Sequence, residues 1–149
     1  MNLQEQFMTE ALKEAKKALS YSEVPIGAVV VRENEIIGRG YNQCELLHDA
    51  TAHAEIFAIH MASETLGNWR LDGCSLYVTL EPCMMCMGAV INARIPRLYF
   101  GAYNKQFDQC RNLSLADTAQ RYHIDIFPSV LNDECEQILS QFFLQKRLF

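Results

Sequence analysis

Hydrophobic residues recur at helical spacing at both ends of the chain. Near the start, Phe7, Ala11, Ala15 and Ala18 repeat every three to four residues, which predicts an amphipathic helix over residues 3–20. The same spacing over residues 131–146 predicts a closing helix. Its apolar stripe comprises Leu131, Cys135, Ile138, Leu139, Phe142 and Phe143.

Short apolar runs rich in β-branched residues predict five strands between these two helices. The first two, at residues 26–31 and 36–42, flank Glu33-Asn34-Glu35, which is typical of a hairpin turn. Glycines at 38 and 40 indicate that another backbone approaches the second strand closely. The remaining strands are predicted at residues 76–80, 98–101 and 123–127.

Further helices are predicted between the strands, over residues 52–66 and from Pro82 to about Ala93. Ile56, Phe57 and Ile59 are the expected core contacts of the first of these. Residues 103–120 are polar, lack a clear period and give no prediction. Because strands alternate with helices after the hairpin, we expect an α/β fold, a three-layer α/β/α sandwich around one mixed five-stranded sheet.

Composition sets limits on this picture. A chain of 149 residues, half of them hydrophobic, is expected to form one domain over residues 1–149. No apolar run approaches the ~20 residues of a membrane span, and the mixed charges of the first helix exclude a signal peptide. The scattered cysteines at 44, 74, 110 and 135 are expected to be buried thiols, which indicates a reducing cytoplasm.

The net charge of −5 argues against indiscriminate binding to nucleic acid. A surface that contacts a nucleic-acid backbone should therefore draw on the basic residues of the last third of the chain. The residues expected to contribute are Arg94, Arg97, Lys105, Arg111, Lys146 and Arg147.

Three potential metal ligands stand out. One imidazole, His53, and two thiols, Cys83 and Cys86, form the ligand set of a catalytic zinc site that keeps its fourth position for water. If Pro82 opens a helix, the two thiols lie one turn apart on the same face. Glu55 is not needed as a ligand and is therefore available to move protons.

The helix that carries His53 needs a start signal. Asp49 and Thr51 precede it, and both residue types are favoured as N-caps. They are expected to place His53 near the N-terminus of its helix, so that two helix starts face one ion.

The pattern H-x-E followed by P-C-x-x-C is shared by nucleobase deaminases, and longer segments around it are more specific. These segments are residues 23–29, 40–42, 49–56, 79–89, 100–102 and 133–143. They resemble the bacterial tRNA-specific adenosine deaminases over nearly the whole chain. Several of them separate that family from cytidine, deoxycytidylate and guanine deaminases.

The resemblance implies a homodimer with one Zn²⁺ per subunit that converts adenosine to inosine at the wobble position of a tRNA anticodon stem-loop. His53, Cys83 and Cys86 would hold the zinc, and Glu55 would shuttle protons. Met84 and its neighbours Met85 and Met87 are expected to contribute to a subunit contact.

Further residues are expected to meet the substrate. By the resemblance, Asn42 would hydrogen-bond the target nucleoside, and Val24, Pro25 and Ile26 would help to wall the base pocket. The backbone amides of Ala54 and of the first metal-ligand cysteine lie next to the ligands in the sequence and could orient the base or the attacking oxygen.

One segment departs from the family. Its members commonly place an aspartate at position 104, near the target nucleotide, followed by a glycine- and alanine-rich loop. This chain has Asn104 and a longer loop without glycine, through residue 113. The departure leaves the zinc chemistry intact and bears on the RNA target.

Two other functions remain open from the sequence. One is a sister deaminase that acts on a free base or nucleotide, such as guanine or a cytosine compound, which the acidic charge and the altered loop favour. The other is a catalytically silent zinc-stabilised RNA-binding or partner subunit, which the presence of Glu55 opposes.

Overall fold

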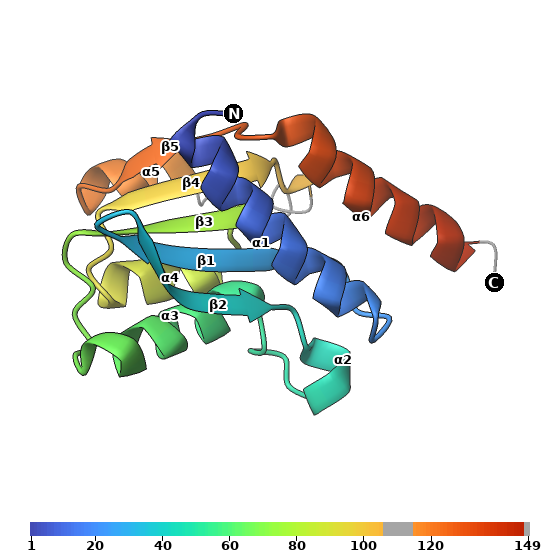
Figure 1. The fold of residues 1–149 in the computed structure, drawn as a ribbon, viewed down its shortest axis with the longest axis horizontal. Coiled ribbons are helices and arrows are strands. Elements are labelled where there is room, and N and C mark those ends of the chain that lie inside the picture. Colours follow the sequence, from blue (N-terminus) through green and yellow to red (C-terminus); the bar gives the residue numbers. More distant parts are fainter. Residues whose placement is uncertain (106–114, 148–149) are drawn as a thin grey trace.

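A computed structural model describes residues 1–105 and 115–147. Helices and strands alternate along most of this part of the chain (Figure 1). The helices are α1 (Leu3–Leu19), α2 (Cys44–Leu47), α3 (Ala54–Leu66), α4 (Met84–Asn92), α5 (Leu115–Arg121) and α6 (Asn132–Arg147). The strands are β1 (Gly27–Arg32), β2 (Glu35–Tyr41), β3 (Cys74–Leu80), β4 (Arg97–Ala102) and β5 (Asp125–Phe127).

The five strands form one mixed sheet in the order β2-β1-β3-β4-β5. β1 is antiparallel to both β2 and β3, whereas β3, β4 and β5 run parallel. The predicted hairpin connects β1 to β2, and Glu33 and Asn34 at its tip adopt the left-handed conformation (φ 50° and 63°) that such tight turns require. The five predicted strands are confirmed.

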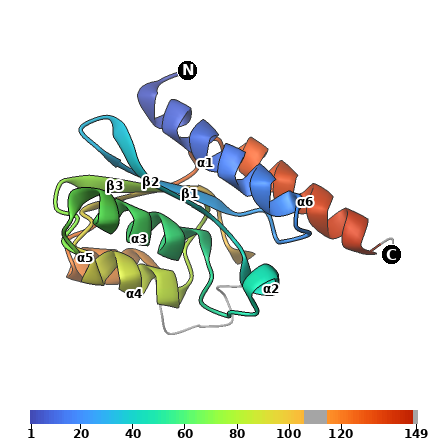
Figure 2. The ribbon, with the colours of Figure 1, turned by 60° about the horizontal axis from the view of Figure 1, so that its bottom comes forward.

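Helices cover both faces of the sheet (Figures 1 and 2). α1 and α6 lie side by side on one face, and α3, α4 and α5 lie on the other. Alternate side chains of the strands point to opposite faces, so Val29 and Tyr77 pack under α1 while Val30 and Val78 pack under α3 and α4. The predicted three-layer α/β/α sandwich is confirmed.

α3 packs against β2 through small residues. A side chain at Gly38 would collide with the backbone of Ala58, and one at Gly40 with the backbone of Ala54. The expected close approach is therefore confirmed. Ile59 packs against the core as expected, but the most deeply buried positions of α3 were not among the expected ones. Alanines at 54, 58 and 62 are fully buried, whereas Ile56, Phe57 and Ile59 are only partly buried, because a backbone this close leaves no room for larger side chains.

Two short helices were missed, α2 and α5, and both are too short to carry a clear period. The second half of α6 projects beyond the sheet (Figure 1), so its apolar stripe is buried at Cys135 and Ile138 but exposed at Phe143. Cys74 is buried as expected, Cys44 is half-buried, Cys110 lies outside the described residues, and every described cysteine is a free thiol. Within residues 1–105 and 115–147, every helix is too short or too polar to span a bilayer.

Candidate active site

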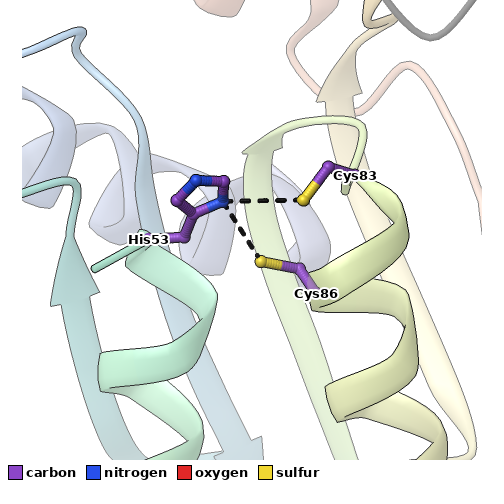
Figure 3. Close-up of side chains that lie close together, drawn as sticks. All are labelled: His53, Cys83 and Cys86. Atoms are coloured by element: carbon purple, nitrogen blue, oxygen red, sulfur yellow. Dashed lines mark hydrogen bonds between the residues drawn. The ribbon is translucent and has the colours of Figure 1, made fainter. Parts of the chain in front are cut away.

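Three predicted ligand residues meet at one end of the sheet (Figure 3). His53 precedes α3, Cys83 precedes α4 and Cys86 lies in the first turn of α4. His53 Nδ1 lies 3.6 Å from Cys83 Sγ and 3.4 Å from Cys86 Sγ, and the imidazole points toward both sulfur atoms. One ligand atom from each of the three residues lies within 4.8 Å of the others.

The chain enters α3 differently from the prediction. His53 itself is the N-cap, with an extended backbone (φ −82°, ψ 152°) and no hydrogen bond from its side chain to the helix. Asp49 accepts hydrogen bonds from the backbone and hydroxyl groups of Thr51 (2.8 and 2.7 Å) and thus closes a local turn. The expected capping by Asp49 and Thr51 is therefore wrong, and the His53 imidazole turns away from its own helix toward the thiols.

α4 begins later in the sequence than was predicted. Cys83 is the N-cap, with φ −72° and ψ 175°, so Pro82 lies before the helix and does not open it. The two cysteines still converge, because an N-cap residue and the third residue of the helix both border the first turn. Two helix N-termini, with their unpaired amides and positive dipole ends, thus face the ligand cluster.

The donor set and its spacing fit zinc. Two ligands around a tetrahedral zinc ion, at about 2.3 Å for sulfur and about 2.0 Å for nitrogen, lie about 3.5 Å apart. The observed nitrogen–sulfur distances of 3.4 and 3.6 Å match this spacing. These three side chains, half-buried for His53 and Cys83 and buried for Cys86, could hold a metal ion.

The two thiols share one proton unequally. A hydrogen bond with Cys86 lowers the pKa of Cys83 to about 4, and the same pairing raises the pKa of Cys86. The hydrogen bond with Cys83 raises the pKa of His53. A thiolate is the form of cysteine that binds metals, so one sulfur of this pair is already in its ligating form at neutral pH.

Glu55 lies next to the ligand cluster, close enough to Cys86 for a side-chain hydrogen bond. It is the second residue of α3 and is only 4 % exposed. Burial raises the pKa of Glu55, while the nearby His53 imidazole acts in the opposite direction. A carboxyl group whose pKa lies above its usual range is better suited to exchange protons near neutral pH.

Residues expected to contact the substrate lie at the same end of the sheet. Asn42 is 7 % exposed. Its side-chain Nδ2 donates to the carbonyl of Val24 (3.2 Å), and its backbone amide donates to the carbonyl of Ile26 (3.0 Å). Pro25 is buried, and Val24 and Ile26 are partly buried. The Gly27 amide donates to Thr79 Oγ1 (3.1 Å), which joins this segment to the strand that leads to Cys83.

Asn42 Oδ1 is buried and has no hydrogen-bond partner within the described residues. A buried amide oxygen without a partner is costly, so this atom is suited to accept a hydrogen bond from a bound molecule. Ala54 is the first residue of α3, and its amide belongs to the N-terminal turn that has no partners within the helix.

Asn104 follows β4, at the same end of the sheet. The backbone amide of Asn104 donates to Glu81 Oε1 (3.0 Å). Glu81 directly precedes Pro82 and the metal-ligand segment. The rest of the loop that was expected to depart from the family, residues 106–113, lies outside the described residues.

Two buried polar side chains that support the site were missed. Glu23 is 1 % exposed and accepts a hydrogen bond from the Leu46 amide (2.6 Å), and Thr79 is fully buried. Glu23 is the first residue of the segment 23–29 that resembles the family. Its burial was not predicted, because a charged residue near a helix end is normally exposed.

Two of the residues expected to form a basic surface lie away from the ligand cluster. Arg97 lies at the start of β4, at the opposite end of the sheet from the ligands, and donates to Ser75 and to the carbonyl of Gly73. Arg94 also lies at that end and donates to the C-terminal carbonyls of α4. The direction of β4 places both residues away from the site. There, their guanidinium groups stabilise a loop and a helix end.

The fold and the site define a class of enzyme. The family model of the MafB19-like deaminases matches residues 1–147. A tRNA-specific adenosine deaminase of Streptococcus pyogenes is 45% identical over 98% of this chain and 94% of its own length. The chain therefore belongs to the deaminase family and, within it, to the tRNA-specific adenosine deaminases.

Solved structures agree with this placement. One, from a study of A-to-I editing by tRNA:A34 deaminases at the wobble position of transfer RNA, is 43% identical, with a TM-score of 0.81 over 90% of this chain and 99% of that chain. A guanine deaminase of Bacillus subtilis is 37% identical, with a TM-score of 0.66 over 74% of this chain and 70% of that chain. The guanine deaminase thus matches less of the chain and matches it less well.

Proposed function

We propose that this chain deaminates adenosine to inosine at the wobble position of a tRNA anticodon stem-loop, as a zinc-dependent homodimer in the cytoplasm. The observation that carries the proposal is the convergence of His53, Cys83 and Cys86, with the buried Glu55 next to them, in a chain of this family. Water and adenosine are consumed, and inosine and ammonia are released.

In this proposal, His53, Cys83 and Cys86 hold the zinc. Zinc held there would supply a water molecule whose pKa is lowered from 15.7 toward about 7. The Glu55 carboxylate accepts a proton from the attacking water and delivers it to N1 of the purine, which makes C6 more electrophilic. The water oxygen bonds to C6. Glu55 then accepts the remaining proton from that oxygen and delivers it to the amine, which leaves as ammonia when the C6–N bond breaks, so that C6 becomes the carbonyl carbon of inosine. The burial of Glu55 keeps bulk water away from these transfers.

The substrate side of the pocket is built from two segments. Asn42 Oδ1 accepts a hydrogen bond from a hydroxyl of the target nucleoside, since Nδ2 is already held by the Val24 carbonyl. The side chains of Val24, Pro25 and Ile26 wall the base, and the Ala54 amide orients it.

The test of this activity uses a synthetic anticodon stem-loop RNA with adenosine at the wobble position. Inosine is expected at that position, and a matched RNA with the adenosine moved into the stem should remain unchanged. Conversion of both RNAs at equal rates, or of neither, would exclude the proposed specificity.

A homodimer is the expected oligomeric state. Met84 is 47 % exposed, and Met85 beside it is also exposed at the start of α4, although Met87 packs in the core and takes no part. Exposed apolar side chains beside a site usually mark an interface. Sedimentation at micromolar concentration should give a particle near twice 17.0 kDa, and the double variant Met84→Glu/Met85→Glu should shift it to the monomer. A wild-type monomer contradicts the prediction.

Asn104 is expected to weaken the discrimination between RNA and DNA. An aspartate can only accept a hydrogen bond, for example from a 2′-hydroxyl, whereas an asparagine can also donate and does not repel phosphate. The wild-type protein should therefore show secondary activity on adenine in a single-stranded DNA loop of the same sequence. Asn104→Asp should raise the RNA/DNA ratio about fivefold, the equivalent of one hydrogen bond of roughly 1 kcal/mol.

The measurement compares both proteins on RNA and DNA hairpins of matching sequence. An equal RNA/DNA activity ratio for both proteins would mean that the Asn104 side chain contributes to the local turn and does not contact the substrate.

A further inference from the structure

Exposed apolar side chains gather at the end of the sheet that carries the ligand cluster. They come from the end of α1, from α2, from the first turn of α4 and from the residue after β4. They are Leu19, Tyr21, Leu46, Leu47, Met84, Met85 and Tyr103. Such a concentration at one end marks a contact surface, because single exposed apolar side chains are otherwise scattered.

Tyr21 differs from the others because its ring is held in place by a second ring. The rings of Tyr21 and Tyr41 stack with centroids 6.2 Å apart and an interplanar angle of 5°. Tyr41 is partly buried. This burial and, to a smaller extent, the neighbouring Tyr21 raise the pKa of Tyr41. Tyr21 is 52 % exposed, so a large part of this residue remains accessible to solvent although its ring stacks on Tyr41.

The backbone under Tyr21 is fixed by the way α1 ends. The Ser22 amide donates to the carbonyl of Leu19, and the Glu23 amide donates to the carbonyl of Ala18 (both 3.1 Å). Ser22 adopts the left-handed conformation (φ 58°) that this type of helix ending requires. Tyr21 is thus part of an ordered helix terminus.

Three contacts tie this terminus to the substrate side of the site. Tyr21 stacks on Tyr41, the neighbour of Asn42. Asn42 Nδ2 donates to the carbonyl of Val24, and the Leu46 amide donates to the buried carboxylate of Glu23. The Tyr21 ring is therefore held at a fixed distance from the residues expected to bind the target nucleoside.

We propose that Tyr21, stacked on Tyr41, is a preformed platform for an unpaired base next to the target adenosine in the RNA loop. This rests on the proposed function. Proteins that recognise single-stranded RNA loops stack the splayed bases on aromatic side chains, and such stacking tolerates any base. Lys16 in the last turn of α1 places positive charge one turn before the platform, where it attracts the phosphates of the same strand, whereas Lys17 beside it is paired with Glu14 (2.8 Å).

The test compares Tyr21→Ala and Tyr21→Phe with a matched control, Tyr122→Ala. Tyr122 is also 52 % exposed, but it lies between α5 and β5, at the opposite end of the sheet from the ligands. On an anticodon stem-loop RNA, Tyr21→Ala should raise KM about tenfold with kcat within about twofold of wild type. Tyr21→Phe and Tyr122→Ala should retain the wild-type KM.

Two further RNAs identify the base, one with an abasic nucleotide on the 5′ side of the target and one on the 3′ side. The difference in KM between wild type and Tyr21→Ala should disappear on one of them. Its persistence on both RNAs, an unchanged KM for Tyr21→Ala on the intact loop, or an equal loss for Tyr122→Ala would overturn the platform. A shift of Tyr21→Ala to the monomer in sedimentation would assign the ring to a subunit contact and also overturn it. A wild-type protein inactive on every RNA would instead refute the proposed function.

Discussion

Replacing Glu55 with alanine is expected to lower turnover on RNA by at least about 100-fold while the zinc content stays at one ion per chain. The carboxyl is buried beside the ligand cluster, but the ligand atoms come from His53, Cys83 and Cys86. Its loss therefore removes proton transfer and leaves the metal donors in place. Zinc content and turnover are measured on the same sample.

Glu64→Ala is the matched control for this experiment. Glu64 lies on the same helix, α3, but is exposed and pairs with His60 (3.0 Å). It should keep both zinc and turnover. Loss of zinc in Glu55→Ala would show that Glu55 is a ligand, and retained turnover would show that another group moves the protons.

Replacing Cys83 or Cys86 with alanine is expected to abolish both zinc binding and activity and to lower thermal stability. The ligands come from the starts of two different helices, so metal binding is linked to the folded arrangement of α3 and α4. A ligand at about 100 times its Kd stabilises a protein by about 2.7 kcal/mol, which for a chain of this size is roughly 5–10 °C in Tm.

Cys44→Ala is the control, because Cys44 is a half-buried free thiol outside the ligand cluster. It should retain zinc, activity and most of the thermal stability. A normal Tm in the zinc-free Cys83 or Cys86 variants would show that the metal contributes nothing to folding.

The elements with a clear period were predictable from the sequence, and so was the ligand cluster. Strands and amphipathic helices are predicted from the local spacing of β-branched and apolar residues, and this spacing can be read from the sequence alone. The triad of His53, Cys83 and Cys86 was predictable because few other roles require one imidazole and a C-x-x-C pair in this context.

The details that failed depend on contacts that the spacing of hydrophobic residues does not specify. Asp49 has the composition of an N-cap, but its carboxylate bonds to Thr51 within a local turn. The core face of α3 is set by Gly38 and Gly40 on another element, which admit only alanine beneath the helix. The spacing within α3 could not reveal this.

Glu23 shows the same limit at the site. A glutamate near a helix end is normally solvated, and only the fold brings the Leu46 amide to its carboxylate and buries it. The stacking of Tyr21 on Tyr41 likewise joins residues on different elements. The roles of Glu23 and Tyr21 beside the expected substrate residues thus emerged only from the three-dimensional arrangement.

The central claim is tested most directly by one measurement of reaction products. The purified protein is incubated with a panel of unmodified tRNAs and, in parallel, with free bases, nucleosides and nucleotides, and inosine and released ammonia are quantified. The account predicts inosine at the first anticodon position of at least one tRNA and no comparable ammonia release from the free compounds. Rapid ammonia release from guanine or a cytosine compound, with no inosine in any tRNA, would contradict it.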